Sequence, residues 1–131
     1  MGITKEGIEG EQMMLSLLRN RGYKCFQPDV IGLINNKYYV FEVKRQDRFN
    51  APPFEGHGLP LWQVRARLEF QKATGVIAIL VVFDKETNEV FYQRLDVLEK
   101  GKYFDTKNKD KNRRRRVYPL EQFEKLNGSL L

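Results

Sequence analysis

The sequence predicts an α/β protein in which helices pack against a sheet. Residues 76–83 are apolar throughout, as in a strand covered on both faces. Two runs of aliphatic and aromatic residues flank the dipeptide Asn35-Asn36, and segments with helical features lie before and after these runs. The 131 residues suit one domain, and an apolar content of 41% is enough for a core.

The first expected element is a helix over residues 4–20, which Thr4 can cap and Gly22 can end. Glu11 lies on its inward-facing side, so a carboxylate is expected to face the interior. The apolar residues on that side fall at helical spacing: Ile8, Leu15 and Leu18, with Met14 beside them.

Strands are expected over residues 23–27, 29–34 and 37–44. Asn35-Asn36 joins the last two as a tight hairpin, because asparagine tolerates positive φ. Residues 45–60 hold three prolines and two glycines and are expected to form a loop. His57, the only histidine, is expected to be a flexible residue of that loop.

Pro60 opens a second expected helix over residues 61–73, which Gly75 closes. Trp62 is expected to pack in the core rather than to stack on a base. The apolar strand over residues 76–83 follows, then a turn over residues 84–89 and a strand over residues 90–94. A last short helix is expected over residues 120–126.

The net charge of +6 is concentrated in residues 100–116. Nine Lys and Arg residues against Asp105 and Asp110 give this segment +7, so the rest of the chain sums to −1. Such a stretch is typical of a surface for nucleic acid, the alternative being a solvated loop. The single cysteine, Cys25, excludes an intrachain disulfide and favours a reducing, cytoplasmic location. The longest apolar run is too short to span a bilayer, so no membrane association is expected.

Charged side chains on the strand over residues 37–44 indicate chemistry. Glu42 and Lys44 project from the same face of the strand, and the hairpin brings Asp29 towards the same end of the sheet. Carboxylate oxygens, with the backbone carbonyl of Val43, are ligands that Mg²⁺ or Mn²⁺ prefers. This set suits phosphodiester hydrolysis, in which Lys44 orients the attacking water, stabilises transition-state charge or acts as a base.

Pro28-Asp29, followed by Glu42-Val43-Lys44, resembles the signature of the PD-(D/E)XK nuclease superfamily. The resemblance covers about residues 4–94 and implies a restriction-endonuclease-like core, in the order α-β-β-β-α-β, with a mixed central sheet flanked by helices. Within the superfamily, the chain is similar to archaeal Holliday-junction resolvases and virus-type replication-repair nucleases. That similarity implies a single nuclease domain over residues 1–131, a homodimer, and Mg²⁺-dependent cleavage of branched DNA in recombination or repair. A phage origin, with action in the host cytoplasm, would fit it.

The resemblance also assigns roles to helix residues. Resolvases carry a Gly and, four residues later, a Glu in their first helix, and Gly7 and Glu11 match that spacing, which implies that Glu11 approaches the metal. Many relatives place a Gln in the helix after Glu-x-Lys, where Gln63 fits best and Gln71 is the alternative. Phosphate contacts are expected from basic residues, namely Lys5, Arg45, Arg65, Arg113, Arg114, Arg115 and Arg116.

Other functions stay open at this point. Gln27-Pro28 leaves no room for the Gly/Ser-rich loop of the resolvases, so selectivity for junctions stays open. A sequence-specific restriction-type endonuclease, with base-reading side chains from the loop over residues 45–60, is one alternative. A non-catalytic nucleic-acid-binding module is another, although a module that only binds needs no Asp29, Glu42 and Lys44. A ribosomal or other RNA-binding protein would explain the basic segment but not the carboxylates.

Overall fold

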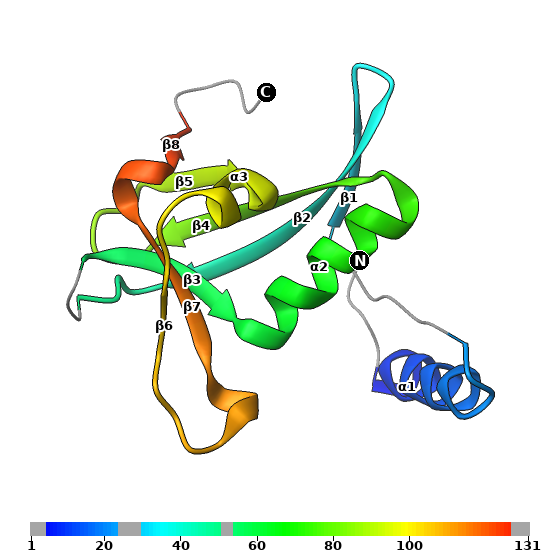
Figure 1. The fold of residues 1–131 in the computed structure, drawn as a ribbon. Coiled ribbons are helices and arrows are strands. Elements are labelled where there is room, and N and C mark those ends of the chain that lie inside the picture. Colours follow the sequence, from blue (N-terminus) through cyan, green and yellow to red (C-terminus); the bar gives the residue numbers. More distant parts are fainter. Residues whose placement is uncertain (1–4, 24–29, 51–53, 127–131) are drawn as a thin grey trace.

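A computed structural model describes residues 5–23, 30–50 and 54–126, without the side chains of residues 5–9, 11 and 112. Its helices are α1 (Lys5–Asn20), α2 (Leu61–Thr74) and α3 (Leu95–Lys100). The main sheet has the order β1 (Val30–Ile34), β2 (Lys37–Gln46), β4 (Ile77–Asp84), β5 (Val90–Arg94) and β8 (Glu124–Lys125). A second sheet has the order β3 (Gly56–Pro60), β7 (Arg115–Pro119) and β6 (Phe104–Asp105). Parallel and antiparallel pairs both occur in the main sheet, so the expected α/β class with a mixed sheet is confirmed (Figure 1).

The hairpin of β1 and β2 forms as the sequence predicts. Asn35 and Asn36 take φ values of 51° and 64°, which asparagine tolerates in a tight turn. At the other end of the ladder, Val30 pairs with Phe41. From β2 the chain crosses over through β3 and α2 and returns as β4, parallel to β2. The helix of such a crossover runs in the direction opposite to both strands.

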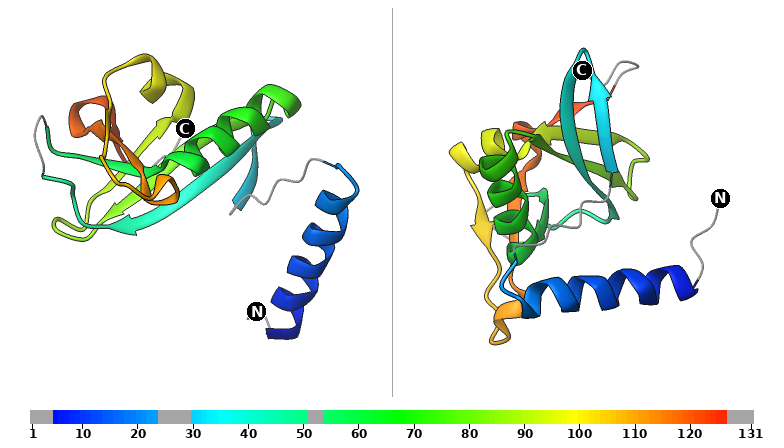
Figure 2. Two further views of the ribbon diagram at one scale, coloured as in Figure 1. Left: turned by 60° about the horizontal axis from the view of Figure 1, so that its bottom comes forward. Right: turned by 90° about the vertical axis from the view of Figure 1, so that its right-hand side faces the viewer.

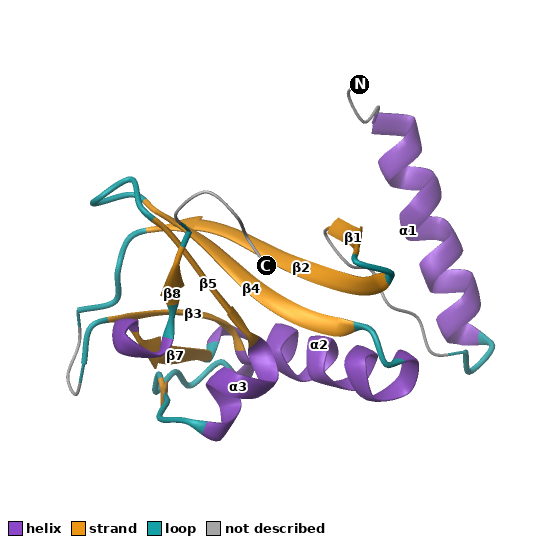
Figure 3. Cartoon of the chain, turned by 90° about the horizontal axis from the view of Figure 1, so that it is seen from above, coloured by secondary structure: helices purple, strands orange, loops and turns teal. Residues whose placement is uncertain are grey.

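The two faces of the main sheet differ in what covers them. α2, α3 and the second sheet lie on one face, where the larger core cluster forms around Val40, Leu80 and Tyr118 (Figure 3). A smaller cluster of Phe41 and Ile79, with several half-buried neighbours, forms on the other face. β4 contributes to both clusters because its side chains alternate between the faces.

Two predictions for the less regular segments are wrong. Residues 45–60 do not form a loop throughout, because β2 extends to Gln46 and β3 forms at Gly56–Pro60. Gly58 suits β3 because a Cβ there would overlap the backbone of β7. In place of a helix over residues 120–126, a 3₁₀ turn (Leu120–Gln122) leads into β8, and α3 forms where no element was predicted. The predicted strand over residues 23–27, apart from Tyr23, lies outside the described residues.

Helix α1 forms over nearly its predicted range but lies apart from the sheets (Figures 1 and 2). Met14 is exposed, as are Met13 and Leu17, whereas Leu15 and Leu18 are half-buried. The predicted inward-facing side of this helix therefore does not join the core, because no sheet face lies against it. Within the described ranges, no helix is long and apolar enough to cross a membrane.

Candidate active site

Strand β2 places Glu42 and Lys44 on the face that α2 covers. Val40, on the same face, belongs to the core cluster beneath α2, and alternation sets Glu42 and Lys44 in line with it. Glu42 is 3% exposed and the Lys44 side chain is 25% exposed, with Lys44 Nζ 3.5 Å from Glu42 Oε1. Glu42 and Lys44 therefore lie together on one strand face, as predicted, and Lys44 is the more solvent-exposed of the two.

Arg67 of α2 is the second cation at Glu42. Its Nε donates a hydrogen bond to Glu42 Oε2 over 2.8 Å, and Arg67 is only 6% exposed. Buried charges are costly unless they are paired, so this contact explains how a strand interior holds a carboxylate. The sequence alone gave Arg67 no such role, because its partner lies 25 residues earlier in the chain.

Gln63 lies one helical turn before Arg67, on the same side of α2. Four helix residues rise about 6 Å, and two strand residues span about 6.6 Å. Because α2 runs opposite to β2, the step from Arg67 back to Gln63 matches the step from Glu42 on to Lys44. Ideal spacing therefore puts Gln63 on the Lys44 side of Arg67, and its Oε1 is buried with no hydrogen-bond partner among the described residues.

Gln71, the alternative to Gln63, has a structural role. Its Nε2 donates to Asp96 of α3 over 3.0 Å, and its Oε1 accepts from the backbone N–H of Ala78 in β4 over 2.9 Å. Both ends of this amide are used in joining α2 to its neighbours. Gln71 is therefore fully used in packing, whereas Gln63 Oε1 has no hydrogen-bond partner among the described residues.

The remaining predicted metal ligands are less fully described. Asp29 lies outside the described residues, and Glu11 belongs to α1 but its side chain is not described. Val43 sits between Glu42 and Lys44, so its backbone carbonyl adjoins the site. Among the residues that the structure describes, no three His, Cys, Asp or Glu side chains come together to hold a metal.

A second buried polar cluster joins the two sheets. His57 of β3 is 0% exposed, and its Nε2 lies 2.8 Å from Asp84 Oδ2 in β4. Its Nδ1 lies 3.0 Å from Gln46 Oε1 in β2, and Arg48 Nε donates to Asp84 over 2.7 Å. The prediction that His57 is a flexible loop residue is therefore wrong, because β3 inserts it between the sheets.

Burial and hydrogen bonding shift the pKa values of this cluster. Burial lowers the pKa of His57, against the opposing effect of the Asp84 carboxylate. Burial also disfavours the charged form of Asp84, but hydrogen bonds from Arg48 and His57 outweigh it and hold the pKa of Asp84 well below its usual value. The cluster is thus held by a carboxylate that stays ionised in the folded chain.

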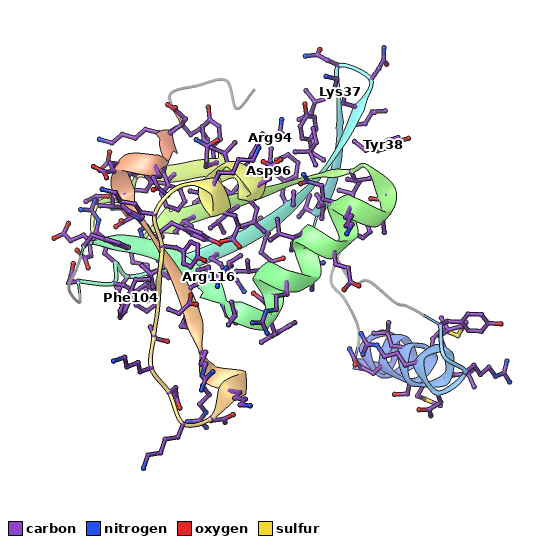
Figure 4. The ribbon with its side chains drawn as sticks, viewed as in Figure 1. Lys37, Tyr38, Arg94, Asp96, Phe104 and Arg116 are labelled. Atoms are coloured by element: carbon purple, nitrogen blue, oxygen red, sulfur yellow. The ribbon has the colours of Figure 1, made fainter. Side chains whose placement is uncertain are left out.

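The basic segment divides into structural and exposed residues. Arg116 Nε and Nη2 bind both carboxylate oxygens of Asp105, its Nη1 binds Glu99 over 2.7 Å, and its guanidinium lies 3.9 Å from the centre of the Tyr103 ring. Figure 4 shows Arg116 beside β6, near Phe104. Its charge is compensated within the chain, so we do not assign it to a nucleic-acid surface.

The other predicted phosphate contacts have varied surroundings. Arg115 is half-buried with its guanidinium 5.5 Å from the centre of the Phe49 ring, Arg113 is exposed, and Arg114 is half-buried. Arg65 is exposed on α2, whereas Arg45 is exposed on the strand face opposite to Lys44. Lys5 lies in α1, and its side chain is outside the described part of the chain.

Trp62 also differs from expectation. The sequence predicts that it packs in the core, but it is 57% exposed. It is the second residue of α2, and its helix position turns it away from the sheet. This prediction is wrong because the apolar neighbours Leu61 and Val64 fill the core-facing side of the helix instead.

No protein-family model matches the chain, and no curated protein matches it significantly.

Proposed function

We propose that this protein is a Mg²⁺-dependent nuclease of the PD-(D/E)XK type that hydrolyses DNA. The observation that carries the proposal is that Glu42 and Lys44 lie together on the strand face beneath α2, the helix that carries Gln63. A buried carboxylate, a partly exposed ammonium group and an amide oxygen with no partner among the described residues are more than packing requires. Buried polar groups without partners are rare and often mark functional sites.

Asp29 completes the proposed site. It directly precedes Val30, whose register partner Phe41 directly precedes Glu42. Asp29 itself lies outside the described residues, and its place in the site rests on the resemblance. Mg²⁺ would then be held by oxygens of Asp29 and Glu42, by the Val43 carbonyl, and by Glu11 if α1 approaches.

The chemistry of the described donors fits a hard cation. Glu42 supplies a carboxylate and Gln63 an oxygen with no hydrogen bond from the described chain. The contact of Glu42 with Lys44 is long, at 3.5 Å, and Lys44 is the more exposed partner. Glu42 would therefore be free to hold a metal, while the 2.8 Å hydrogen bond from Arg67 keeps its Oε2 in place. Bound Mg²⁺ would supply positive charge that stabilises the phosphate in the transition state.

The residues of the chain then have distinct tasks. Lys44, released from Glu42, donates hydrogen bonds to the attacking water or to a phosphate oxygen. Gln63, on the Lys44 side of Arg67, accepts a hydrogen bond from the same water through Oε1 and so helps to orient it. The water oxygen bonds to phosphorus, the ester bond to the sugar oxygen breaks, and one proton passes to that oxygen. Arg67 is a positioning residue, because it fixes the Glu42 carboxylate rather than touching substrate.

The fold supports the same proposal. An antiparallel β1–β2 pair, a crossover through α2 and a β4 strand parallel to β2 are compatible with the restriction-endonuclease-like core. The homodimer and the preference for branched DNA rest on the resemblance alone. A site that cuts one strand needs a second copy to cut both strands of a junction.

The test is cleavage of supercoiled plasmid, linear duplex, single-stranded DNA and a four-way junction, with Mg²⁺ or Mn²⁺ or with a chelator. We expect metal-dependent cleavage that Lys44→Ala abolishes and that Lys37→Ala, at the far end of β2 (Figure 4), leaves intact. The ranking of substrates separates a junction-selective enzyme from a restriction-type enzyme, which cuts at one fixed sequence. Tight binding without cleavage of any substrate would overturn the proposal in favour of a binding module.

A further inference from the structure

We propose that Trp62 and a cationic hollow beside it bind an unpaired stretch of nucleic acid, with Trp62 stacked on a base. This inference deepens the proposed function, on which it rests for the nature of the polyanion, by naming the substrate class: DNA with unpaired nucleotides. It concerns a surface on the solvent side of α2, outside the Glu42–Lys44 site.

The hollow lies between the start of α2 and the hairpin of β6 and β7. Its volume is about 690 Å³, within the range of ligand sites. Four cations line it, together with Leu61 and Asp105: Arg65, Lys107, Lys109 and Arg114. Asp105 does not cancel them, because Arg116 already binds both of its carboxylate oxygens over 2.7 and 2.9 Å. The hollow therefore has a net positive charge that attracts phosphate.

The loop that carries the lysines is held in place before any ligand binds. The backbone N–H of Thr106 donates to the carbonyl of Arg115, and the Thr106 hydroxyl accepts from the N–H of Arg115, each over 2.9 Å. Arg114 Nε donates to the carbonyl of Asn108 over 3.2 Å. The N–H of Leu61 donates to the carbonyl of Arg114 over 2.8 Å, which joins the loop to α2. Because these contacts preorganise the cations, a bound strand costs less ordering entropy.

Trp62 stands between the hollow and the proposed active site. Successive helix residues turn by about 100°, so Leu61 and Arg65 face one flank of α2 and Gln63 faces the other. Trp62 points to solvent between these flanks and is 57% exposed. A strand that lies across the start of α2 would thus pass from the hollow over the indole ring towards Lys44.

Stacking on Trp62 requires an open base face. In a duplex, neighbouring pairs cover both faces of each base, whereas an unpaired base leaves its faces free for an aromatic side chain. Such stacking contributes roughly 5- to 150-fold in affinity per base. Cations that bind phosphates together with an exposed aromatic ring are the usual elements of single-strand binding. The combination favours single-stranded segments, flaps and junction branch points over intact duplex.

Trp62 is the only tryptophan, so its emission reports directly on the proposed contact. The experiment titrates the full chain, in chelator, with an oligothymidylate of about 12 nucleotides and with a blunt duplex of the same length. We expect saturable quenching by the oligothymidylate and at least about 5-fold weaker binding of the duplex. Equal affinity for both probes, or no quenching, would overturn the inference.

Variants locate the contact. Trp62→Ala should weaken binding of a labelled oligothymidylate about 5-fold or more in anisotropy, while Trp62→Phe keeps most of it. Lys107→Ala/Lys109→Ala should flatten the slope of log affinity against log salt by about 1.4, because each single-strand phosphate contact contributes about 0.7. The charge-matched control Lys72→Ala/Lys85→Ala, two exposed lysines that do not line the hollow, should leave the slope unchanged. An equal change in both double variants would refute a role for the hollow.

Two further measurements keep this inference separate from the proposed function. A wild-type chain that is quenched by the oligothymidylate but cuts no substrate would overturn the nuclease and leave the Trp62 site standing. Metal-dependent cleavage without quenching of the Trp62 emission would support the nuclease and overturn the Trp62 site. Binding of polyglutamate as tight as that of the oligothymidylate would show a surface for acidic proteins instead.

Discussion

The pairing of Glu42 with Arg67 is the interaction on which the proposed site most depends. Arg67→Met removes the guanidinium but keeps an unbranched apolar stem, so it opens little cavity. Glu42, 3% exposed, then loses the 2.8 Å hydrogen bond and, among the described residues, retains the 3.5 Å contact with Lys44. Removing one partner of a buried pair costs about 3–5 kcal/mol, and the residual contact with Lys44 places the expected loss near 3 kcal/mol. For a chain of this size, that corresponds to a fall in Tm of roughly 10–15 °C.

Urea denaturation at neutral pH without metal measures this loss. The control is Arg65→Met, the same change at an exposed position on the same helix, which should alter stability by less than about 0.5 kcal/mol. The double variant Glu42→Gln/Arg67→Met should lose less than the sum of the single variants, because no unpaired charge stays buried. A loss for Arg67→Met no larger than that of Arg65→Met, or additive losses in the double variant, would refute the buried-pair reasoning.

Three further outcomes follow from packing and charge. Gly58→Ala forces a Cβ onto the backbone carbonyl of Arg116 in β7 and should lower the free energy of unfolding, measured in urea, by about 3 kcal/mol or more. Gly10→Ala, which has open space around it, should leave the free energy of unfolding unchanged. Equal effects of the two variants would contradict the close approach of β3 to β7. Arg116→Gln should lose about 1–2 kcal/mol in thermal unfolding, because two carboxylates lose their shared cation; an unchanged Tm would count against that role. Stability should fall as the pH drops below about 6.5, because the unfolded chain binds a proton at His57 more readily than the folded chain does. It should fall again below about 4, where the unfolded chain protonates Asp84 but the folded chain does not. Denaturation curves from pH 7 to pH 3 check both windows, and Asp84→Asn should flatten the lower one.

The sequence predicted correctly those turns and strands that depend only on neighbouring residues. Asn35 and Asn36 need only their own backbone preference to form a turn, and the all-apolar run of β4 needs only the absence of polar side chains. Glu42 and Lys44 share a face because of strand alternation, which holds in any sheet. These parts of the fold and of the site were therefore visible without tertiary information.

Other features depend on partners far along the chain. β3 reads as a loop because glycine and proline dominate it, yet those glycines are what lets β7 approach. His57 is buried because β3 brings it to Asp84, 27 residues later, and Arg67 is recognisable as part of the site only once α2 lies over Glu42. No side-chain N-cap precedes α3, so the sequence gives no signal for where this helix begins. The predicted burial of His57 and of Trp62 was wrong because tertiary contacts, and not the local sequence, decide whether these side chains are buried.

The polar cluster of His57, Asp84, Gln46 and Arg48 also connects the two sheets. The two sheets share no strand, and this cluster lies where β3 of one meets β2 and β4 of the other. The proposed strand-binding hairpin belongs to one sheet and the proposed catalytic strand to the other. In the proposed enzyme, the angle between the sheets would therefore set how far a bound nucleotide lies from the bond to be cut. A change in this cluster would then move the position of the cut along the strand while leaving both surfaces chemically intact.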